Sequence, residues 1–293
     1  MTQRAAENID IGRVVVWMGG ALLSFSVMAV SIRALAATFS VFEILAVRSA
    51  GGLMVLAALA LMRPALRPLL RTRRIGLHAL RNSVHFAAQY AWALSITLLP
   101  LGTAFALEFT MPAWLALFAT WLLGERMTPS RTGAIALGFL GALVILRPGL
   151  QSFQPAALIM LAAALGFALA AIAVKKLIAT ETTFAILFFM NAMQLPMNLA
   201  GSSATFLGKI EPANALPLIG VAIAGLSSHY CLTNALRAGD ATIVVPLDFL
   251  RIPLIALIGW SLYGEPLDAF VFAGAAIIGA GIFWNLRAEA ARE

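Results

Sequence analysis

The sequence predicts an all-α membrane protein with ten transmembrane helices arranged as two inverted five-helix repeats. Its composition is the first reason: 61% of the residues are hydrophobic and only 11% are charged, whereas a soluble domain is roughly 25% charged. The apolar residues also come in runs of about 20, the length that a helix needs to cross a bilayer. Finally, matching residues recur 140 to 142 positions apart along the chain.

Ten apolar segments follow one another with short links between them. Pro100 separates the third segment from the fourth, and Gly239 with Asp240 separates the eighth from the ninth. Almost no residues remain for a soluble domain, so any function must lie within the membrane. The predicted helices are 13–35, 41–62, 76–99, 101–123, 131–147, 155–177, 184–206, 213–236, 242–263 and 267–287.

The N-terminus predicts a retained helix. Glu7 and Asp10 precede a long apolar stretch, unlike the basic start and short apolar core of a cleaved signal peptide. The single cysteine, Cys231, excludes an internal disulfide and a cysteine metal cluster. We expect it to be a small packing residue within a helix.

The net charge of +7 would suggest nucleic acid in a soluble protein, but its distribution favours a membrane. If the N-terminus is cytoplasmic, most basic residues fall in cytoplasmic links, as the positive-inside rule requires. Both termini are then predicted to be cytoplasmic, and the arginines of the link 63–75 can also bind anionic lipid headgroups. The cytoplasmic group is Arg63, Arg67, Arg71, Arg73, Arg74, Arg126, Arg131, Lys175, Lys176, Arg237, Arg287 and Arg292, against Arg33, Arg147 and Lys209 outside.

The repeats divide the chain into residues 1–150 and 151–293. Phe25 matches Phe167 at an offset of 142, and Gln89-Tyr90 match His229-Tyr230 at an offset of 140. Glu108-Phe109 likewise match Asp248-Phe249, and Gly124-Glu125 match Gly264-Glu265. Because five is an odd number of crossings, the second repeat is inverted. Such repeats are typical of carriers that open alternately to either side of the membrane.

Glu108 and Asp248 are buried acids at equivalent places of the two repeats. An ionised carboxylate in hydrocarbon needs a partner, so both should face the protein interior. Asp248 is expected to pair with Arg251 on the same helical face, and Glu108 with Arg48 on the second helix. Two interpretations stay open: ion pairs that fix helix packing, or a site that binds substrate or a proton.

A polar stripe marks the third helix at spacings of three and four, which places it on one face. His85, Gln89 and Trp92 are its deeper members and suit a small ligand with an apolar body and a polar head. Hydrogen bonding between helices is the alternative. The full stripe is His78, Asn82, His85, Gln89 and Trp92.

Further candidates for the central lining are Phe25, Tyr90, Tyr230 and Phe249, on the first, third, eighth and ninth helices. Asn191, Gln194 and Asn198 on the seventh helix favour interhelical hydrogen bonding. Pro112, Pro246 and Pro253 predict kinks in the fourth and ninth helices. Glycines on the fifth and tenth helices predict close packing or a dimer surface: Gly133, Gly138, Gly141, Gly274, Gly279 and Gly281.

With these features the chain resembles the EamA domain of the drug/metabolite transporter superfamily. The resemblance lies in the stretch PAWLALFATWLLGERMTPSRTGAIALGFLGALVIL (112–146), in the two Gly-Glu turns and in the glycines that follow. The whole pattern is most similar to YddG-type exporters of aromatic and other neutral amino acids. The resemblance implies a central cavity lined by the first, third, fourth, sixth, eighth and ninth helices.

The leading functional prediction is a bacterial inner-membrane secondary transporter that exports amino acids by alternating access. Its partners would be the small-molecule substrate and membrane lipid, with no nucleic acid, and it would act as a monomer or homodimer. Another small metabolite or drug is the alternative substrate. An enzyme is less favoured: we predict no catalytic residue, no metal and no cofactor, since only three histidines occur and neither an HExxH nor a phosphate-binding loop is present. A passive channel or a structural membrane protein is the third class.

Overall fold

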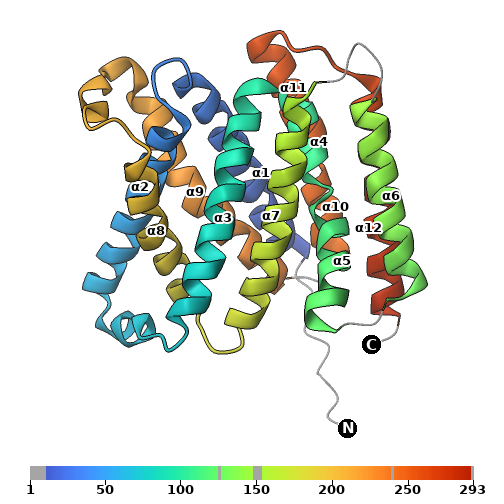
Figure 1. The fold of residues 1–293 in the computed structure, drawn as a ribbon, viewed down its shortest axis with the longest axis horizontal. Helices are drawn as coiled ribbons and strands as arrows, with labels where there is room; N and C mark the ends of the chain where they lie inside the picture. Colours follow the sequence, from blue (N-terminus) through green and yellow to red (C-terminus); the bar gives the residue numbers. More distant parts are fainter. Residues whose placement is uncertain (1–10, 125–126, 148–153, 239–240, 292–293) are drawn as a thin grey trace.

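The computed structural model describes residues 11–124, 127–147, 154–238 and 241–291. Over these ranges the chain is helical throughout its regular structure (Figure 1). Two short 3-10 helices, η1 (Pro64–Leu70) and η2 (Phe206–Lys209), lie in connections. The α-helices are α1 (Ile11–Leu35), α2 (Val41–Met62), α3 (Ile75–Leu98), α4 (Leu101–Glu108), α5 (Met111–Leu123), α6 (Pro129–Leu146), α7 (Ala156–Leu177), α8 (Thr183–Ala200), α9 (Pro212–Ala238), α10 (Ala241–Phe249), α11 (Arg251–Tyr263) and α12 (Ala269–Ala290).

Within the described ranges, nine segments are long and apolar enough to cross a membrane, with α4 and α5 counted as one and α10 and α11 as another. Helix α3 has 24 residues but falls outside this group because its polar stripe lowers its hydropathy. Ten crossings therefore stay a prediction. Most helix ends agree with the predicted segments to within two residues, but the segment 184–206 was too long. Helix α8 ends at Ala200, and η2 follows.

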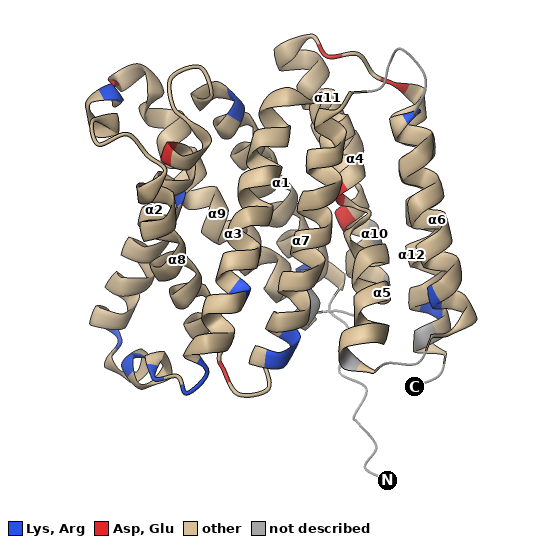
Figure 2. Ribbon diagram, viewed as in Figure 1, with Lys and Arg blue, Asp and Glu red and all other residues tan. Residues whose placement is uncertain are grey.

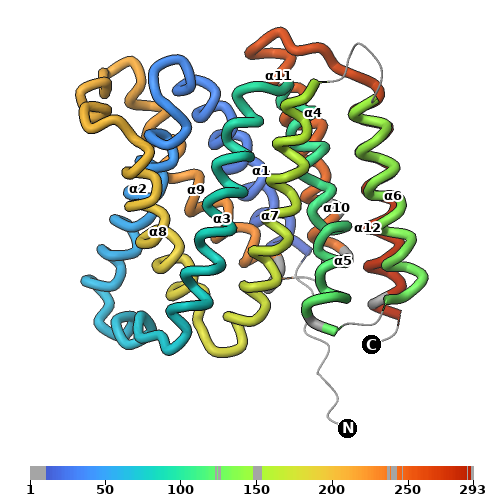
Figure 3. Tube along the Cα trace, viewed as in Figure 1, coloured from blue at the N-terminus to red at the C-terminus, as the bar shows by residue number. Residues whose placement is uncertain are grey.

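The helices pack in pairs that join the two halves of the chain. Helix α1 lies along α9 and α3 lies along α7, while α2 packs on α8 and α6 on α12, as the tube in Figure 3 also shows. In the predicted repeats α1 corresponds to α7 and α9 to α3, so exchanging the halves exchanges these two pairs. This pattern is consistent with a two-repeat transporter fold. The boundary at residue 150 lies outside the described residues, so the two predicted domains stay a prediction.

The glycines of α6 and α12 serve packing within the chain. A Cβ at Gly141 would lie 2.5 Å from the Gly274 carbonyl oxygen, and one at Gly133 would lie 2.0 Å from the Trp284 ring. The two helices approach this closely only because these positions lack a side chain. Of the two predicted roles for these glycines, intramolecular packing is the one observed.

Charge is distributed unevenly between the two ends of the bundle (Figure 2). The chain enters α1 and leaves α12 at the lower end in Figure 1, and the basic residues of the α2–α3 connection lie at that end. Lys175 and Lys176, at the end of α7, lie there as well. The last turn of α1 with Arg33, the end of α6 with Arg147 and η2 with Lys209 lie at the opposite end. Arg126, Arg292 and the side chain of Arg237 fall outside the described residues.

Candidate functional site

Two membrane-crossing segments are broken in their middle, at the predicted acids. Helix α4 ends at Glu108 and α5 starts at Met111, while α10 ends at Phe249 and α11 starts at Arg251. Each break is a tight turn, with the Thr110 N–H bonded to the Leu107 carbonyl at 3.1 Å and the Leu250 N–H to that of Leu247 at 3.1 Å. Pro112 and Pro253 stand in the first turns of α5 and α11, where a missing N–H costs nothing. The prolines thus mark breaks in these segments rather than simple kinks.

The two breaks meet around one guanidinium group. Arg251 Nη2 donates to Asp248 Oδ2 at 3.2 Å, and Arg251 Nη1 lies 3.5 Å from Glu108 Oε1. The predicted Asp248–Arg251 pair is confirmed. The predicted Glu108–Arg48 pair is wrong, because the break before α11 brings Arg251 against Glu108 and satisfies the carboxylate there. Two carboxyl groups therefore share one cation, and by formal charge the negative groups outnumber the positive one.

Aromatic rings enclose these charges. The Arg251 guanidinium carbon lies 4.2 Å from the centre of the Phe25 ring and 4.8 Å from that of Phe109, distances typical of cation–π contacts. The equivalent phenylalanines Phe109 and Phe249 face each other with ring centres 4.3 Å apart. Trp92 Nε1 donates to Glu108 Oε2 at 2.8 Å. We call Arg251, Glu108, Asp248, Trp92 and the phenylalanines Phe25, Phe105, Phe109 and Phe249 the Arg251 cluster.

Some polar atoms of the Arg251 cluster make no hydrogen bond within the cluster. Asp248 Oδ1 and Arg251 Nε are buried without a hydrogen-bond partner. The side chains of Glu108 and Asp248 are each 16% exposed, whereas that of Arg251 is 6% exposed. The carboxylates therefore face a less tightly packed region than the cation, and they can accept a further donor.

Four of the predicted site residues are not members of the Arg251 cluster: His85, Gln89, Tyr90 and Tyr230. His85 is buried and its Nδ1 lies 2.9 Å from Gln194 Nε2 of α8. Gln89 is also buried on the same helix. Tyr90 packs on Phe42, with ring centres 4.5 Å apart, and is half-buried.

Tyr230 lies apart from the Arg251 cluster. Its side chain is 58% exposed, and its ring meets Trp17 edge-on at 5.7 Å. The structure does not bring it together with Trp92 or Glu108, although Tyr90 is its counterpart in the first repeat.

Two buried residues are not among the predicted site residues, one in the Arg251 cluster and one outside it. Phe105 is completely buried on α4 beneath Arg251. Arg81 is buried on α3 and donates to Asn82 Oδ1 at 2.7 Å. Its position was detectable, because it lies three residues after His78 and four before His85, on the polar stripe.

A second group of charges joins several helices at the upper end of the bundle. Arg33 of α1 pairs with Glu265 and also donates to the carbonyls of Ile96 and Leu99 at the end of α3. Glu265 Oε2 accepts from the N–H of Leu101, the first residue of α4, at 2.7 Å. We call these contacts the Arg33–Glu265 clamp. It connects α1, α3, α4 and the end of α11 at one point.

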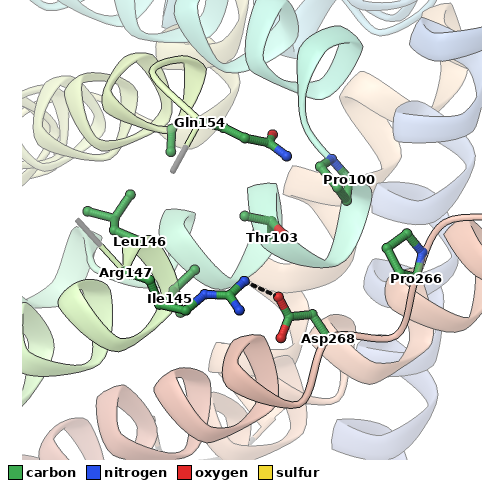
Figure 4. A pocket seen from close by; sticks show the side chains of 9 residues that line it. Pro100, Thr103, Ile145, Leu146, Arg147, Gln154, Pro266 and Asp268 are labelled. Carbon is green, nitrogen blue, oxygen red and sulfur yellow. Dashed lines mark hydrogen bonds and ion pairs between the residues drawn. The ribbon is translucent and has the colours of Figure 1, made fainter. Parts of the chain in front are cut away.

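A pocket opens beside the clamp (Figure 4). It lies between the start of α4, the end of α6 and the start of α7, and the Arg147–Asp268 ion pair forms one wall. None of the predicted site residues lines it. Its lining is Pro100, Thr103, Ile145, Leu146, Arg147, Gln154, Ala157, Pro266 and Asp268.

A separate groove runs between α10–α11 and α12. Phe249, Pro253 and Gly279 are among its lining residues. Phe249 therefore lies between this groove and the Arg251 cluster, which makes it the one predicted residue that borders both.

Broken helices that meet at buried charges inside a bundle of apolar helices define the class of multi-pass membrane transporters. The chain belongs to the EamA-like transporter family, whose domain matches it twice, over residues 12–147 and 154–287. This confirms the predicted family and agrees with the prediction that the chain is not an enzyme. A solved crystal structure shares the fold, with a TM-score of 0.62, 17% identity and coverage of 94% of this chain and 97% of the other.

The relatives transport various small molecules. A riboflavin transporter of Rhizobium johnstonii is 32% identical over 236 residues, which span 75% of this chain and 76% of that protein. An S-adenosylmethionine uptake transporter of Rickettsia prowazekii is 27% identical over 71% of each chain. A pseudopaline exporter of Pseudomonas aeruginosa is 29% identical over 88% of this chain and 90% of the other. These relatives do not single out aromatic amino acids, so that finer prediction is not confirmed.

Proposed function

We propose that this protein is a secondary transporter of the bacterial inner membrane that moves a small amphipathic metabolite by alternating access. Ten segments cross the membrane in this proposal, with α3 as the tenth, and both termini are cytoplasmic. The single observation that carries it is the meeting of two broken helices at the Arg251 cluster. Broken helices at a shared charged site are the arrangement by which carriers hold a substrate between two gates.

The polar stripe of α3 supports a crossing in spite of its low hydropathy. His85 and Gln89 are buried against other helices, and Gln194 satisfies the His85 ring. Polar groups that face protein do not meet lipid, so they do not prevent a helix from spanning the bilayer.

The uneven distribution of basic residues between the two ends of the bundle supports the proposed orientation in the membrane. The end with the α2–α3 arginines would face the cytoplasm under the positive-inside rule. The Arg33–Glu265 clamp would then face the outside and act as the outer gate. In this arrangement export requires the clamp to open while the cytoplasmic side closes.

The Arg251 cluster supports a substrate that combines a ring with a polar head. Phe25 and Phe249 are half-buried and offer ring faces, and the two carboxylates can accept hydrogen bonds from an ammonium group. Neutral and aromatic amino acids fit this description and remain our first candidates for export. The riboflavin transporters among the relatives make a flavin the second candidate.

The proposal is tested with the purified protein in proteoliposomes. Uptake and counterflow of labelled phenylalanine, threonine, methionine and riboflavin are measured with and without a pH gradient, with a sugar as control. We expect saturable transport and counterflow of at least one of these compounds. Flux that does not saturate would indicate a channel and would refute the proposal.

Variants of the cluster decide whether it holds the substrate. Glu108→Gln preserves the shape of the side chain and its hydrogen bond from Trp92 but removes the charge. We expect Km for the transported compound to rise at least about tenfold, because a charged hydrogen bond contributes about 1.5–3 kcal/mol. Unchanged Km and unchanged pH dependence would assign Glu108 a purely structural role.

A further inference from the structure

Two arginines lie deep in the bundle, away from the Arg251 cluster, and lack an acidic partner among the described residues. Arg48 of α2 is 4% exposed and Arg81 of α3 is 6% exposed. The helices that carry them pack together with α8, and α2 also packs on α9. Both side chains are therefore enclosed by protein from several sides.

Their donor groups are largely unused. Arg48 Nε and Nη1 and Arg81 Nε are buried and have no hydrogen-bond partner. The bond from Arg81 Nη1 to Asn82 Oδ1, at 2.7 Å, is to a neutral amide. A guanidinium carries five N–H donors, and a buried cation is stabilised only when these donors meet acceptors.

The acidic residues near the bundle core are already engaged elsewhere. In the described part of the chain, each acid that is not fully exposed has its own partner, and none of these partners is Arg48 or Arg81. The pairs are Glu43 with Lys209, Glu108 and Asp248 with Arg251, Glu181 with His78 and Thr72, Glu265 with Arg33, and Asp268 with Arg147.

The positive charges also act on one another. Arg48 and Arg81 carry like charges on α2 and α3, two helices that contact each other and both pack on α8. Two like charges enclosed in the same region of the protein repel each other, and this repulsion destabilises the charged form of both side chains. A negative group placed between them would offset this repulsion.

The fold holds Arg48 in a defined place. A Cβ on Gly225 of α9 would lie 2.5 Å from Arg48 Nε and 2.9 Å from its Cγ. The guanidinium therefore crosses α9 at the one residue type that leaves room for it. A loosely placed surface arginine would not need such a glycine.

From these observations we infer that Arg48 and Arg81 bind an anionic group of the transported metabolite: a carboxylate, phosphate or sulfonate. The inference rests on the proposed transport function and narrows its substrate class. The Arg251 cluster has one positive charge and two negative ones, so the two regions have opposite net charge. Arg81 and Trp92 are eleven positions apart on α3, about 16 Å along its axis, so a short metabolite such as phenylalanine would contact one region at a time, and a longer one such as riboflavin 5′-phosphate can reach towards both.

Matched pairs of ligands test the inference on the full-length protein in nanodiscs of neutral lipid. Phenylalanine is compared with phenylalaninamide, and riboflavin 5′-phosphate with riboflavin, by calorimetric titration. Sulfate and inorganic phosphate are titrated alone. We expect the anionic member of at least one pair to bind about tenfold or more tightly, since charge-assisted hydrogen bonds are worth that much. We expect sulfate and phosphate to bind far more weakly than that member.

Variants test whether the preference for the anionic ligand depends on Arg48 and Arg81. Arg48→Gln and Arg81→Gln should each abolish the preference for the anionic member, while Arg71→Gln, at an exposed position of the α2–α3 connection, should retain it. Arg48→Lys keeps the charge and should retain part of the preference. Gly225→Ala leaves both charges in place but displaces the Arg48 side chain, so it should weaken binding even if Arg48→Gln fails to fold.

The outcomes separate this inference from the proposed function. Saturable transport without any preference for the anionic member, or a preference that survives in both glutamine variants, would overturn the inference and leave the proposed function standing. If sulfate alone binds as tightly as the anionic member of a pair, the arginines bind an inorganic counter-ion, and the inference is also overturned. If the protein binds no member of either pair, the inference fails together with the proposed substrates.

Discussion

Removing the charge of Glu265 should open the upper end of the bundle. Glu265→Gln keeps the size of the side chain but breaks the ion pair with Arg33 and weakens the bond that Glu265 Oε2 accepts from the Leu101 N–H, 2.7 Å long. In the structure these contacts join α1, α4 and the end of α11. A state open at this end would have to separate them.

The size of this destabilisation depends on which contacts of Arg33 are lost in Glu265→Gln and which are kept. The side chains of Arg33 and Glu265 are only 15% and 13% exposed, so water screens the pair weakly. Arg33 keeps the carbonyls of Ile96 and Leu99 as acceptors, so no cation is left without partners. The substitution should therefore destabilise the observed state, relative to one open at this end, by about 2–3 kcal/mol. A buried charge left without any partner would cost more. The smaller destabilisation shifts the population towards the open state by about 30- to 150-fold.

Cysteine labelling measures this shift. The chain has one cysteine, so Cys231→Ala gives a clean background. Ser26 of α1 is 4% exposed, seven residues before Arg33, and Ser26→Cys serves as the reporter. A membrane-impermeant maleimide is added to intact cells, and the labelling rate is compared with and without Glu265→Gln.

An unchanged or slower labelling rate would refute the reasoning, because it would mean that the clamp does not hold the closed state. Asp268→Asn is the matched control. It breaks an ion pair of the same connection, but with Arg147 at the end of α6, outside the clamp. We expect this variant to leave the labelling rate unchanged.

Three further predictions concern packing and the Arg251 cluster, and each is measured as a change in thermal unfolding of the purified protein. Arg251→Gln leaves two unneutralised carboxylates and should cost about 3–5 kcal/mol; adding Glu108→Gln should restore part of it, and no restoration would contradict the shared pairing. Trp92→Phe removes the N–H donor to Glu108 and should cost about 1–2 kcal/mol, whereas no loss would show that the bond contributes nothing. Gly141→Leu places side-chain atoms against the Gly274 carbonyl and should cost about 1–3 kcal/mol without changing substrate affinity, and an altered affinity would count against a purely packing role.

Much of the fold was predictable because the bilayer fixes the length of an apolar helix. The ends of α2 and α7 follow directly from where the apolar runs stop. The end of α8 was misplaced because Phe206 extends the apolar run beyond Gly201, although the serines between them form a turn. Hydrophobicity alone does not separate a helix end from a short 3-10 helix that packs on the bundle.

The site was predictable where repetition supplied the information. Glu108 and Asp248 were found because each repeat carries one, and the Phe109–Phe249 contact follows from the same symmetry. The partner of Glu108 was not predictable, because depth in the membrane is compatible with several basic residues and only the packing of α11 selects Arg251. Arg81 lies on the same face of α3 as the neutral polar residues of the stripe, so its burial follows from the same spacing of three and four residues.

The polar stripe of α3 has a consequence for how the chain is made. A helix with this many polar residues gains little from entering lipid alone, and the amide that satisfies its His85 belongs to Gln194, 109 residues later in the chain. At about 5–20 residues per second, roughly 5–20 s pass before that partner leaves the ribosome. During this interval we expect α3 to wait at the insertion machinery or at the membrane surface, and to settle fully only when α7 and α8 arrive.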